Sequence, residues 1–207
     1  MKRSGKNSLI KLEYGAYFNA IHNLITLGIL EDASYTYINI GEYSTIGQQL
    51  SMTYRAKRWT ANVNATYIGR YNPDSEEADV DRYSFSPELG TNVRYFILQD
   101  RLQVNVFYKF NGQLQSFSVD EAGAVSTSRQ AAYHILDLSF TADFLKEKNL
   151  SLTLGAKNLL NVQQVQVLGQ AQSGVHSSSS AFNAARGVSV FLGLRYQFQF
   201  KNKDNEK

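Results

Sequence analysis

Apolar and polar residues alternate strictly along several long segments of this sequence, and this alternation constrains the fold more than any other feature. In residues 101–111, one set of positions holds Leu102, Val104, Val106, Tyr108 and Phe110, and the intervening set holds Arg101, Gln103, Asn105, Phe107, Lys109 and Asn111. A period of two places successive side chains on opposite faces of a strand, whereas an amphipathic helix repeats its apolar positions every three or four residues. The pattern therefore predicts β-strands.

Seven further segments alternate in the same way, most clearly residues 136–144 and 188–200. We predict strands at residues 8–25, 35–55, 58–71, 84–97, 101–115, 132–145, 149–160 and 186–200. Strands in soluble proteins usually run to about 5–6 residues, whereas a tilted strand that crosses a bilayer needs about 9–11. The predicted lengths favour strands that cross a membrane.

The connections between these segments alternate between short turns and long polar loops. The short turns lie at residues 56–57, 98–100 and 146–148, and the long loops at residues 72–83, 116–131 and 161–185. Transmembrane β-barrels have short turns on the periplasmic side and long loops outside. We therefore expect an all-β fold, an antiparallel transmembrane β-barrel of about eight strands in residues 1–200, followed by a polar C-terminal tail at residues 201–207. We expect residues 161–185 to form a mobile outer loop.

Charged residues are confined to one face of the predicted strands. The apolar faces carry no Asp, Glu, Lys or Arg, and the opposite faces carry Lys11, Glu13, Arg58, Glu88, Arg94, Lys109, Asp137, Asp143, Lys157 and Arg195. An Arg or Lys that faces the middle of a bilayer costs about 2–4 kcal/mol, so we expect the uncharged face to contact lipid. A soluble β-sandwich would also keep charge off its core face, and it is the strand lengths and the loop pattern that favour the membrane. Aromatic residues near both ends of the strands predict two interfacial girdles.

Composition excludes several other classes of protein. The absence of cysteine excludes disulfide scaffolds, thiolate metal sites and thiol nucleophiles. The basic residues are scattered and the net charge is only +3, so we expect no nucleic-acid partner. The longest apolar run, Leu24–Leu30, is too short for a membrane-spanning helix. The basic start, Met1–Lys6, is not followed by the apolar core of a signal peptide, so we expect an export signal to lie outside this sequence.

No residue set in the sequence has the pattern of a catalytic, cofactor-binding or metal site. His22, His134 and His176 are far apart and have no neighbouring His or Cys, as a metal site would require. The serines 177–180 beside His176 are better interpreted as part of a flexible loop than as nucleophiles. The mixed charges of the polar face have two open interpretations: they hold a plug domain in a lumen by ion pairs, or they are polar only because water fills the interior.

Residues 152–161, Leu-Thr-Leu-Gly-Ala-Lys-Asn-Leu-Leu-Asn, resemble the end of a TonB-dependent outer-membrane receptor. In that family, a strand that ends in Asn-Leu-Leu/Phe-Asn leads into the last outer loop, and here Arg186-Gly187 and a closing strand follow in the same order. Residues 17–25, and residues 37–41 with Gly47, are similar to other recurring stretches. The chain departs from the family at its end, because Lys201 to Lys207 follow Phe200, the closing aromatic residue.

The resemblance implies a 22-stranded barrel, of which this chain matches about the last eight strands. It implies that the plug domain and the segment that contacts the energy-transducing TonB-type protein belong to an N-terminal part missing from this chain. The implied partners are outer-membrane lipid, the plug domain, the TonB-type protein and the barrel-assembly machinery, and no cofactor is implied. The resulting hypothesis is a non-catalytic barrel segment of a receptor for nutrient uptake in the outer membrane.

A free-standing eight-stranded outer-membrane barrel, acting as an anchor, adhesin or narrow pore, is the alternative. A membrane-barrel enzyme is a weaker one, because no nucleophile, base and orienting group can be assembled from the sequence. The first two hypotheses differ in their strand pairing. A small closed barrel must pair residues 8–20 with residues 188–200, whereas a receptor segment leaves both edges open.

Overall fold

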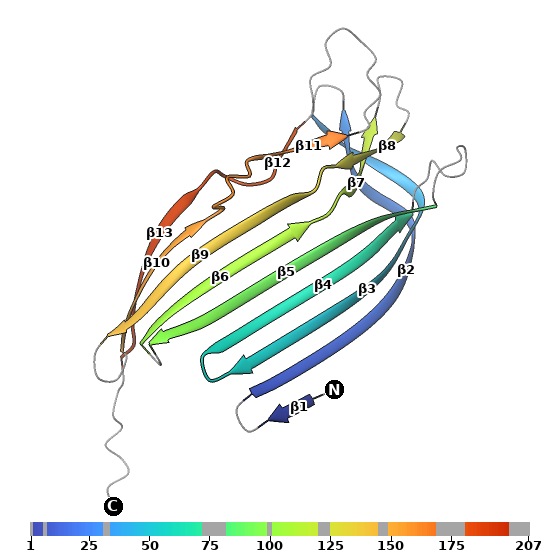
Figure 1. The fold of residues 1–207 in the computed structure, drawn as a ribbon. Coiled ribbons are helices and arrows are strands. Elements are labelled where there is room, and N and C mark those ends of the chain that lie inside the picture. The colour runs from blue at the N-terminus through green and yellow to red at the C-terminus, as the bar shows by residue number, and fades with distance from the viewer. Residues whose placement is uncertain are drawn as a thin grey trace, which may run out of the picture.

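The computed structural model describes residues 2–5, 8–30, 34–71, 82–98, 101–119, 125–144, 149–168 and 181–198. The regular elements in these ranges are all β-strands (Figure 1). They are β1 (Lys2–Gly5), β2 (Ser8–Leu30), β3 (Tyr35–Ala56), β4 (Trp59–Tyr71), β5 (Tyr83–Leu98), β6 (Leu102–Asn111), β7 (Leu114–Val119), β8 (Val125–Gln130), β9 (Tyr133–Phe144), β10 (Leu150–Lys157), β11 (Gln164–Leu168), β12 (Ala181–Asn183) and β13 (Ser189–Tyr196). In the same ranges, no helix has the length and apolar character needed to cross a membrane.

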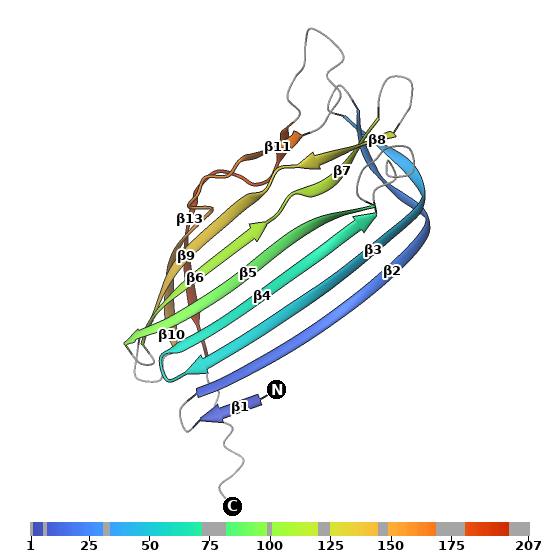
Figure 2. The ribbon, with the colours of Figure 1, turned by 45° about the vertical axis from the view of Figure 1, so that its right-hand side comes forward.

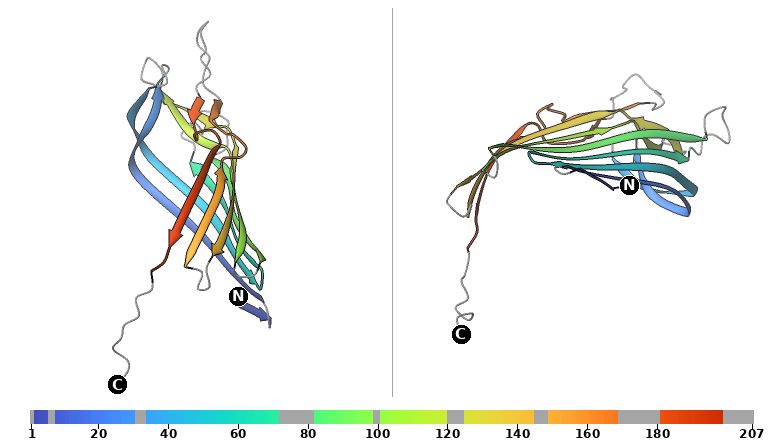
Figure 3. Two further views of the ribbon diagram at one scale, coloured as in Figure 1. Left: turned by 90° about the vertical axis from the view of Figure 1, so that its left-hand side faces the viewer. Right: turned by 60° about the horizontal axis from the view of Figure 1, so that its bottom comes forward.

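Eight of these strands form one curved wall in the order β2-β3-β4-β5-β6-β9-β10-β13, with every neighbouring pair antiparallel. They correspond one to one, and in the same order, to the eight strands predicted from the alternation. The predicted all-β antiparallel fold is therefore confirmed. Figures 1 and 2 show the wall strands lying side by side with a common inclination, and Figure 3 shows the curvature of the wall.

One register runs across the whole wall. Each residue of an apolar row is the direct partner of the next: Ile10, Tyr54, Ala61, Val93, Val106, Leu138, Ala156 and Val190. The adjacent row, on the opposite face, runs Leu9, Arg55, Thr60, Arg94, Asn105, Ser139, Gly155 and Phe191. The separation of charged from uncharged faces that was read strand by strand therefore holds across the assembled sheet.

Neighbouring strands of the wall are joined by short connections at one end, here called the inner end, and by long ones at the other, the outer end, except that residues 31–34 alone join β2 to β3 at the outer end. The short connections follow Ala56, Leu98 and Phe144, and the long ones follow Tyr71, Asn111 and Lys157. The alternation of short and long connections therefore agrees with the prediction.

Two of the predicted loops contain additional strands, which corrects the sequence prediction. Within the expected loop at 116–131, β7 and β8 form an antiparallel hairpin. Within the expected loop at 161–185, β11 pairs with β8 and with β12, so its assignment as an unstructured loop was wrong at residues 164–168 and 181–183. These strands, here called the outer rim, contain mostly polar residues and are fixed by pairing with one another. The rest of that predicted loop, including His176 and the serines 177–180, lies outside the described residues.

Several predicted strand ends also differ from the structure. β2 continues to Leu30, five residues beyond its predicted end, and β6 ends at Asn111, where the Gly112 amide donates a hydrogen bond to the Pro87 carbonyl oxygen (2.8 Å). β13 is shorter than predicted at both ends. The predicted polar tail at 201–207 lies outside the described part of the chain.

The edges of the wall do not meet one another in the described residues. β13 pairs only with β10, and β2 pairs with β3, with β1 at its inner end and with β7 at its outer end. The ladder between residues 8–20 and the last strand, which a closed eight-stranded barrel requires, is not among the described pairings. The described strands therefore leave the two edges of the wall unpaired with each other, which is the pairing expected of a segment of a larger barrel.

Three aromatic rings lie flat over glycines on the neighbouring strand. Tyr17 covers Gly47, Phe85 covers Gly69 and Phe191 covers Gly155, and each pair is in direct register. A ring that covers a cross-strand glycine shields the backbone and fixes the register of the pair. These pairs connect β2 with β3, β4 with β5 and β10 with β13.

Adding a methyl group under one of these rings should destabilise the wall. A Cβ at Gly155 would overlap the Phe191 ring and lie 2.9 Å from the Ser139 Cβ, whereas a Cβ at Gly193 would come no closer than 3.8 Å to any neighbour. We expect Gly155→Ala to lower the free energy of unfolding by about 1–3 kcal/mol, as overpacking does, and Gly193→Ala to leave it nearly unchanged. Urea unfolding in liposomes followed by circular dichroism measures both, and equal effects would contradict the proposed role of the ring.

Candidate functional site on the two faces of the wall

The two faces of the wall differ in solvent exposure, and the pattern is the reverse of that in a soluble protein, where apolar side chains are buried and polar ones are exposed. Large apolar side chains are exposed, as for Leu192 at 70%, while polar side chains on the other face are buried, as for Ser86 at 1% and Ser151 at 4%. Among the described residues, only Ile40 and Val165 are buried hydrophobic side chains. A soluble β-sandwich packs its apolar faces together in a core, so the sandwich alternative does not fit. The apolar face needs a non-aqueous environment, which a bilayer provides.

Aromatic residues pair at both ends of this apolar face. At the inner end, the rings of Trp59 and Tyr95 lie 4.4 Å apart, and those of Tyr196 and Phe198 lie 4.6 Å apart. At the outer end, Tyr67 stacks on Phe85 at 4.9 Å. This placement is what the girdle hypothesis expects, since girdle residues lie at the two membrane interfaces.

Polar side chains on the opposite face bond across the strands. The Ser151 hydroxyl donates a hydrogen bond to the Asp143 carboxylate (2.5 Å) and accepts one from the Arg195 guanidinium (3.0 Å), so three strands share one network. Near the outer end, Arg70 lies 4.0 Å from Glu88. Arg70 was absent from the charged residues noted in the sequence, although its position on the polar face follows from the register with Ser84. The charges on this face are thus partly paired within the wall itself.

The polar face also holds buried groups that have no hydrogen-bond partner in the described part of the chain. They are Arg70 Nη1, Ser86 Oγ, Asn105 Oδ1 and Asn111 Nδ2, and on β7 of the outer rim both amide atoms of Gln115 also have none. Buried polar groups are almost always hydrogen-bonded to protein or water. These groups therefore identify a surface suited to polar neighbours, as the lumen side of a barrel would be.

Asn158, in the segment that resembles the receptor family, is a centre of hydrogen bonding that sequence reasoning missed. It is buried, with φ of 54°, and its backbone amide donates to the Asp137 carboxylate (2.8 Å). Its side-chain nitrogen donates to the carbonyl oxygens of Val162 and Arg186 (both 2.8 Å), and its side-chain oxygen accepts from the Val162 amide (3.0 Å). Asparagine tolerates positive φ better than most residues. Asn158 therefore fixes the connection that leaves β10 against both β9 and the approach to β13.

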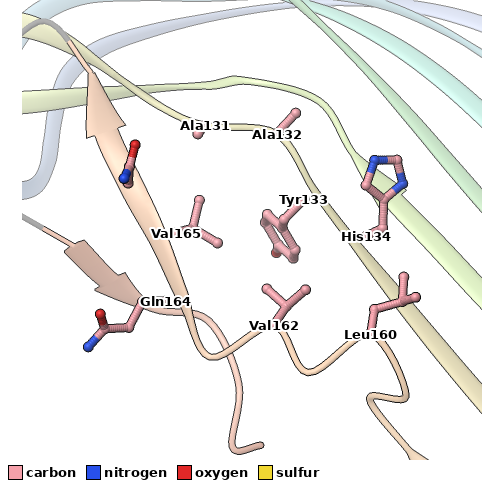
Figure 4. A pocket seen from close by; sticks show the side chains of 9 residues that line it. Ala131, Ala132, Tyr133, His134, Leu160, Val162, Gln164 and Val165 are labelled. Atoms are coloured by element: carbon pink, nitrogen blue, oxygen red, sulfur yellow. The ribbon is translucent and has the colours of Figure 1, made fainter.

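A cavity of about 440 Å³ lies beside this connection (Figure 4). It is lined by Ala131, Ala132, Tyr133, His134, Leu160, Val162, Gln164, Val165 and Gln166. Figure 4 shows Tyr133, Val162 and Val165 grouped between the start of β9 and the segment that leads into β11. Its lining is mainly apolar, and it is a shallow depression that is open to its surroundings. The sequence did not predict this pocket, because residues 161–166 were assigned to a loop.

The two described histidines lie on different strands and have different neighbours. His22 on β2 is exposed, and its Nδ1 lies 3.8 Å from the Glu42 carboxylate. His134 on β9 stacks on Phe110 and lies 2.6 Å from the Tyr108 hydroxyl. Within the described ranges, no three His, Cys, Asp or Glu side chains are grouped so that they could hold a metal ion. That the chain has no catalytic, cofactor or metal residues remains a prediction.

Comparison with known proteins agrees with this geometry. Residues 6–196 match the model of the outer membrane protein beta-barrel family. The chain belongs to this family. The predicted outer-membrane location is therefore confirmed, and that the uncharged face of this outer-membrane β-barrel protein contacts lipid remains a prediction. No curated protein matches the chain.

A solved structure resembles the fold. It is the ferripyoverdine receptor of the outer membrane of Pseudomonas aeruginosa, crystallised with ferripyoverdine bound. The TM-score is 0.57 at 15% sequence identity, and the match covers 93% of this chain and 25% of the receptor chain. This chain thus spans a quarter of that receptor's length, and its wall has the fold of part of a larger barrel.

The assignment of faces can be tested with paired arginine substitutions. We expect Val104→Arg and Leu192→Arg, on the lipid face, to block membrane assembly, because an arginine that faces lipid is disfavoured, by about 2–4 kcal/mol at the bilayer midplane and by less toward the interfaces. Asn105→Arg and Gln197→Arg, on the other face, should be tolerated. The amount of folded protein in the outer membrane is the measurement, and equal behaviour of all four variants would show that the faces are wrongly assigned.

Substitution of Asn158 should loosen the outer connection. Asn158→Ala removes three side-chain hydrogen bonds, each worth about 0.5–1.5 kcal/mol, and places at positive φ a residue that tolerates this conformation less well than asparagine. Asn158→Gly removes the same bonds without that backbone cost. We expect both variants to increase protease cleavage within residues 159–168, with alanine the more severe, whereas Asn161→Gly should have little effect. Unchanged cleavage in both would contradict the role of Asn158.

Proposed function

We propose that this chain is the C-terminal wall segment of a TonB-dependent outer-membrane receptor that imports a nutrient. In this function the segment is non-catalytic. It contributes part of the lipid-facing wall, part of the polar surface that faces the lumen, and the outer rim. The plug domain and the segment that contacts the TonB-type protein come from the N-terminal part of the receptor. The barrel-assembly machinery would insert the complete barrel.

The observation that carries this proposal is the pair of open edges. In hydrocarbon, an unpaired strand edge costs several kcal/mol for each unsatisfied backbone group, so a wall with two open edges needs further strands. β1 supports this interpretation, because it pairs with residues 8–11 of β2 at the position that a preceding wall strand would occupy. The similarity to a quarter of a known receptor chain also supports it.

The chemistry of the polar face supports a barrel lumen that holds a plug domain. It has internal ion pairs and bridges, such as Arg70 with Glu88, and further buried groups without partners, such as Asn111 Nδ2. A plug domain in the lumen would supply polar groups to such a surface. An interior filled only by water would also accept it, so the open edges remain the main support.

Cysteine cross-linking tests the proposal directly, since the chain has no native cysteine. We expect no disulfide in outer membranes when Leu12→Cys or Tyr14→Cys, on β2, is combined with Val190→Cys, Leu192→Cys or Leu194→Cys, on β13. Leu154→Cys with Leu192→Cys is the positive control, because these two residues are direct partners.

Efficient cross-linking between β2 and β13 would contradict the proposal and favour a free-standing eight-stranded barrel. A second measurement is the mass of the mature protein in the outer membrane. A receptor should migrate far above the mass of these 207 residues, and a mature product of this size would likewise contradict the proposal.

A further inference from the structure

The hairpin formed by β2 and β3 is much longer than a membrane-spanning hairpin needs to be. Its strands have 23 and 22 residues, whereas a tilted strand crosses a bilayer in about 9–11 residues. With the inner turn at the membrane surface, the far halves of both strands extend beyond the outer end of the wall. We call this part, residues 24–30 and 34–40, the outer arm.

The ladder of the hairpin is interrupted where the arm begins. Asn23 has φ of 56°, and Asn23 and Gly41 are the one pair of opposite positions that is not bridged in the ladder, between the pairs His22 with Glu42 and Leu24 with Ile40. The exposed large apolar residues of β2 are even-numbered as far as Phe18 and odd-numbered from Ile21 onward. β3 shows the same change, from odd-numbered Tyr35 and Tyr37 to even-numbered Ile46. The hairpin thus turns a different face outward in the arm than in the wall, and on β2 the change begins at Ile21, two residues before Asn23.

Beyond the break, the arm reaches a strand that is not its neighbour in the wall. Ile29 and Leu30 of β2 pair in parallel with Ser118 and Val119 of β7. In the wall, β3, β4 and β5 lie between β2 and β6, the strand that β7 continues. The arm must therefore pass the outer ends of β4 and β5, and Figures 1 and 2 show the end of β2 curving over toward β7.

The contact that holds the arm in this position is small. Among the described residues, the backbone pairing of the arm with β7 consists of two residue pairs, and parallel pairing is slightly less stable per residue than antiparallel pairing. The hairpin itself is held by an almost continuous antiparallel ladder on both sides of the break. Such a combination of a stiff arm, a local break and a small distal contact has the form of a hinged element.

We propose that the outer arm is a strap that pivots at Asn23 and Gly41, latches onto β7, and controls entry into the lumen from outside. This inference rests on the proposed function in that it takes the polar face to line a lumen. When latched, the strap covers the mouth between β2 and β7. When released, it leaves that part of the mouth open.

The latch can be tested by disulfide formation in outer membranes that carry the full protein. Paired residues on adjacent strands lie about 4.8 Å apart, within the range that a disulfide spans. We expect Ile29→Cys with Ser118→Cys to cross-link, as Thr53→Cys with Asn62→Cys should in the wall, and Thr26→Cys with Ser118→Cys to remain reduced. A cross-link in the wall control without one at the latch would overturn the proposal.

The pivot is tested in the same background. A β-branched residue strongly disfavours positive φ, so Asn23→Val should lower the yield of the latch cross-link several-fold, while Asn23→Gly should preserve it. Wall cross-linking should not change in either variant. Equal yields from Asn23→Val and Asn23→Gly would show that the break is not the pivot.

Control of entry is measured by labelling a lumen cysteine from outside. Ser84→Cys lies near the outer end on the polar face, in register with Arg70. With the latch disulfide formed, a bulky membrane-impermeant maleimide should react with this cysteine several-fold more slowly than after reduction, and equal rates would overturn the gating role. These readouts need neither ligand nor TonB-type protein, so failure of the receptor proposal, seen as cross-linking of β2 to β13, is distinguishable from failure of the strap.

Discussion

Lateral hydrogen bonding between strands is the constraint on which the rest of this structure depends. A membrane offers no water to the backbone, so each wall strand must satisfy its peptide groups with its neighbours. The continuous register across eight strands meets that requirement in the interior of the wall, and the requirement is unmet only at the two edges. The same constraint determines which side chains face lipid, because a shift of one residue in any ladder would turn a strand's polar side chains toward hydrocarbon.

The outer end of the molecule is organised by a different balance of forces. Beyond the bilayer, water competes for backbone groups and the order of the strands no longer has to follow the wall. β7, β8, β11 and β12 pair in a rim, and the arm of β2 joins it. At this end, hydrogen bonds of single polar residues fix the positions of the connections. Asn158 does so by linking the connection after β10 to β9 and to the segment before β13.

The wall could be predicted from the sequence because apolar and polar residues alternate along its strands with a period of two. In Leu102 to Phe110 and Val188 to Tyr196 every second residue is apolar, since one face of each strand must avoid charge, although Phe107 and Phe191 place an aromatic residue on the other face. The rim was not predictable in the same way. Val125–Gln130 has no apolar face, so its strand character depends on partners distant in sequence. The candidate cavity and the hydrogen bonds of Asn158 were not predicted for a similar reason. Both lie where the chain leaves a regular ladder, and the local sequence pattern does not indicate which distant residues the chain contacts there.

The apolar row from Ile10 to Val190 also has a consequence for depth. It begins near the inner end of β2 and finishes near the outer end of β13, because a row perpendicular to tilted strands climbs through the bilayer. With a strand spacing of about 4.8 Å and a tilt of about 35–45°, seven steps rise roughly 20 Å, most of the apolar band of about 25 Å. Residues that are partners in one flat ladder therefore sample successive layers of the membrane, from one leaflet to the other. Val93 and Val106, in the middle of the row, lie at the depth where an introduced charge is least tolerated, while Ile10 and Val190 lie near opposite headgroup regions.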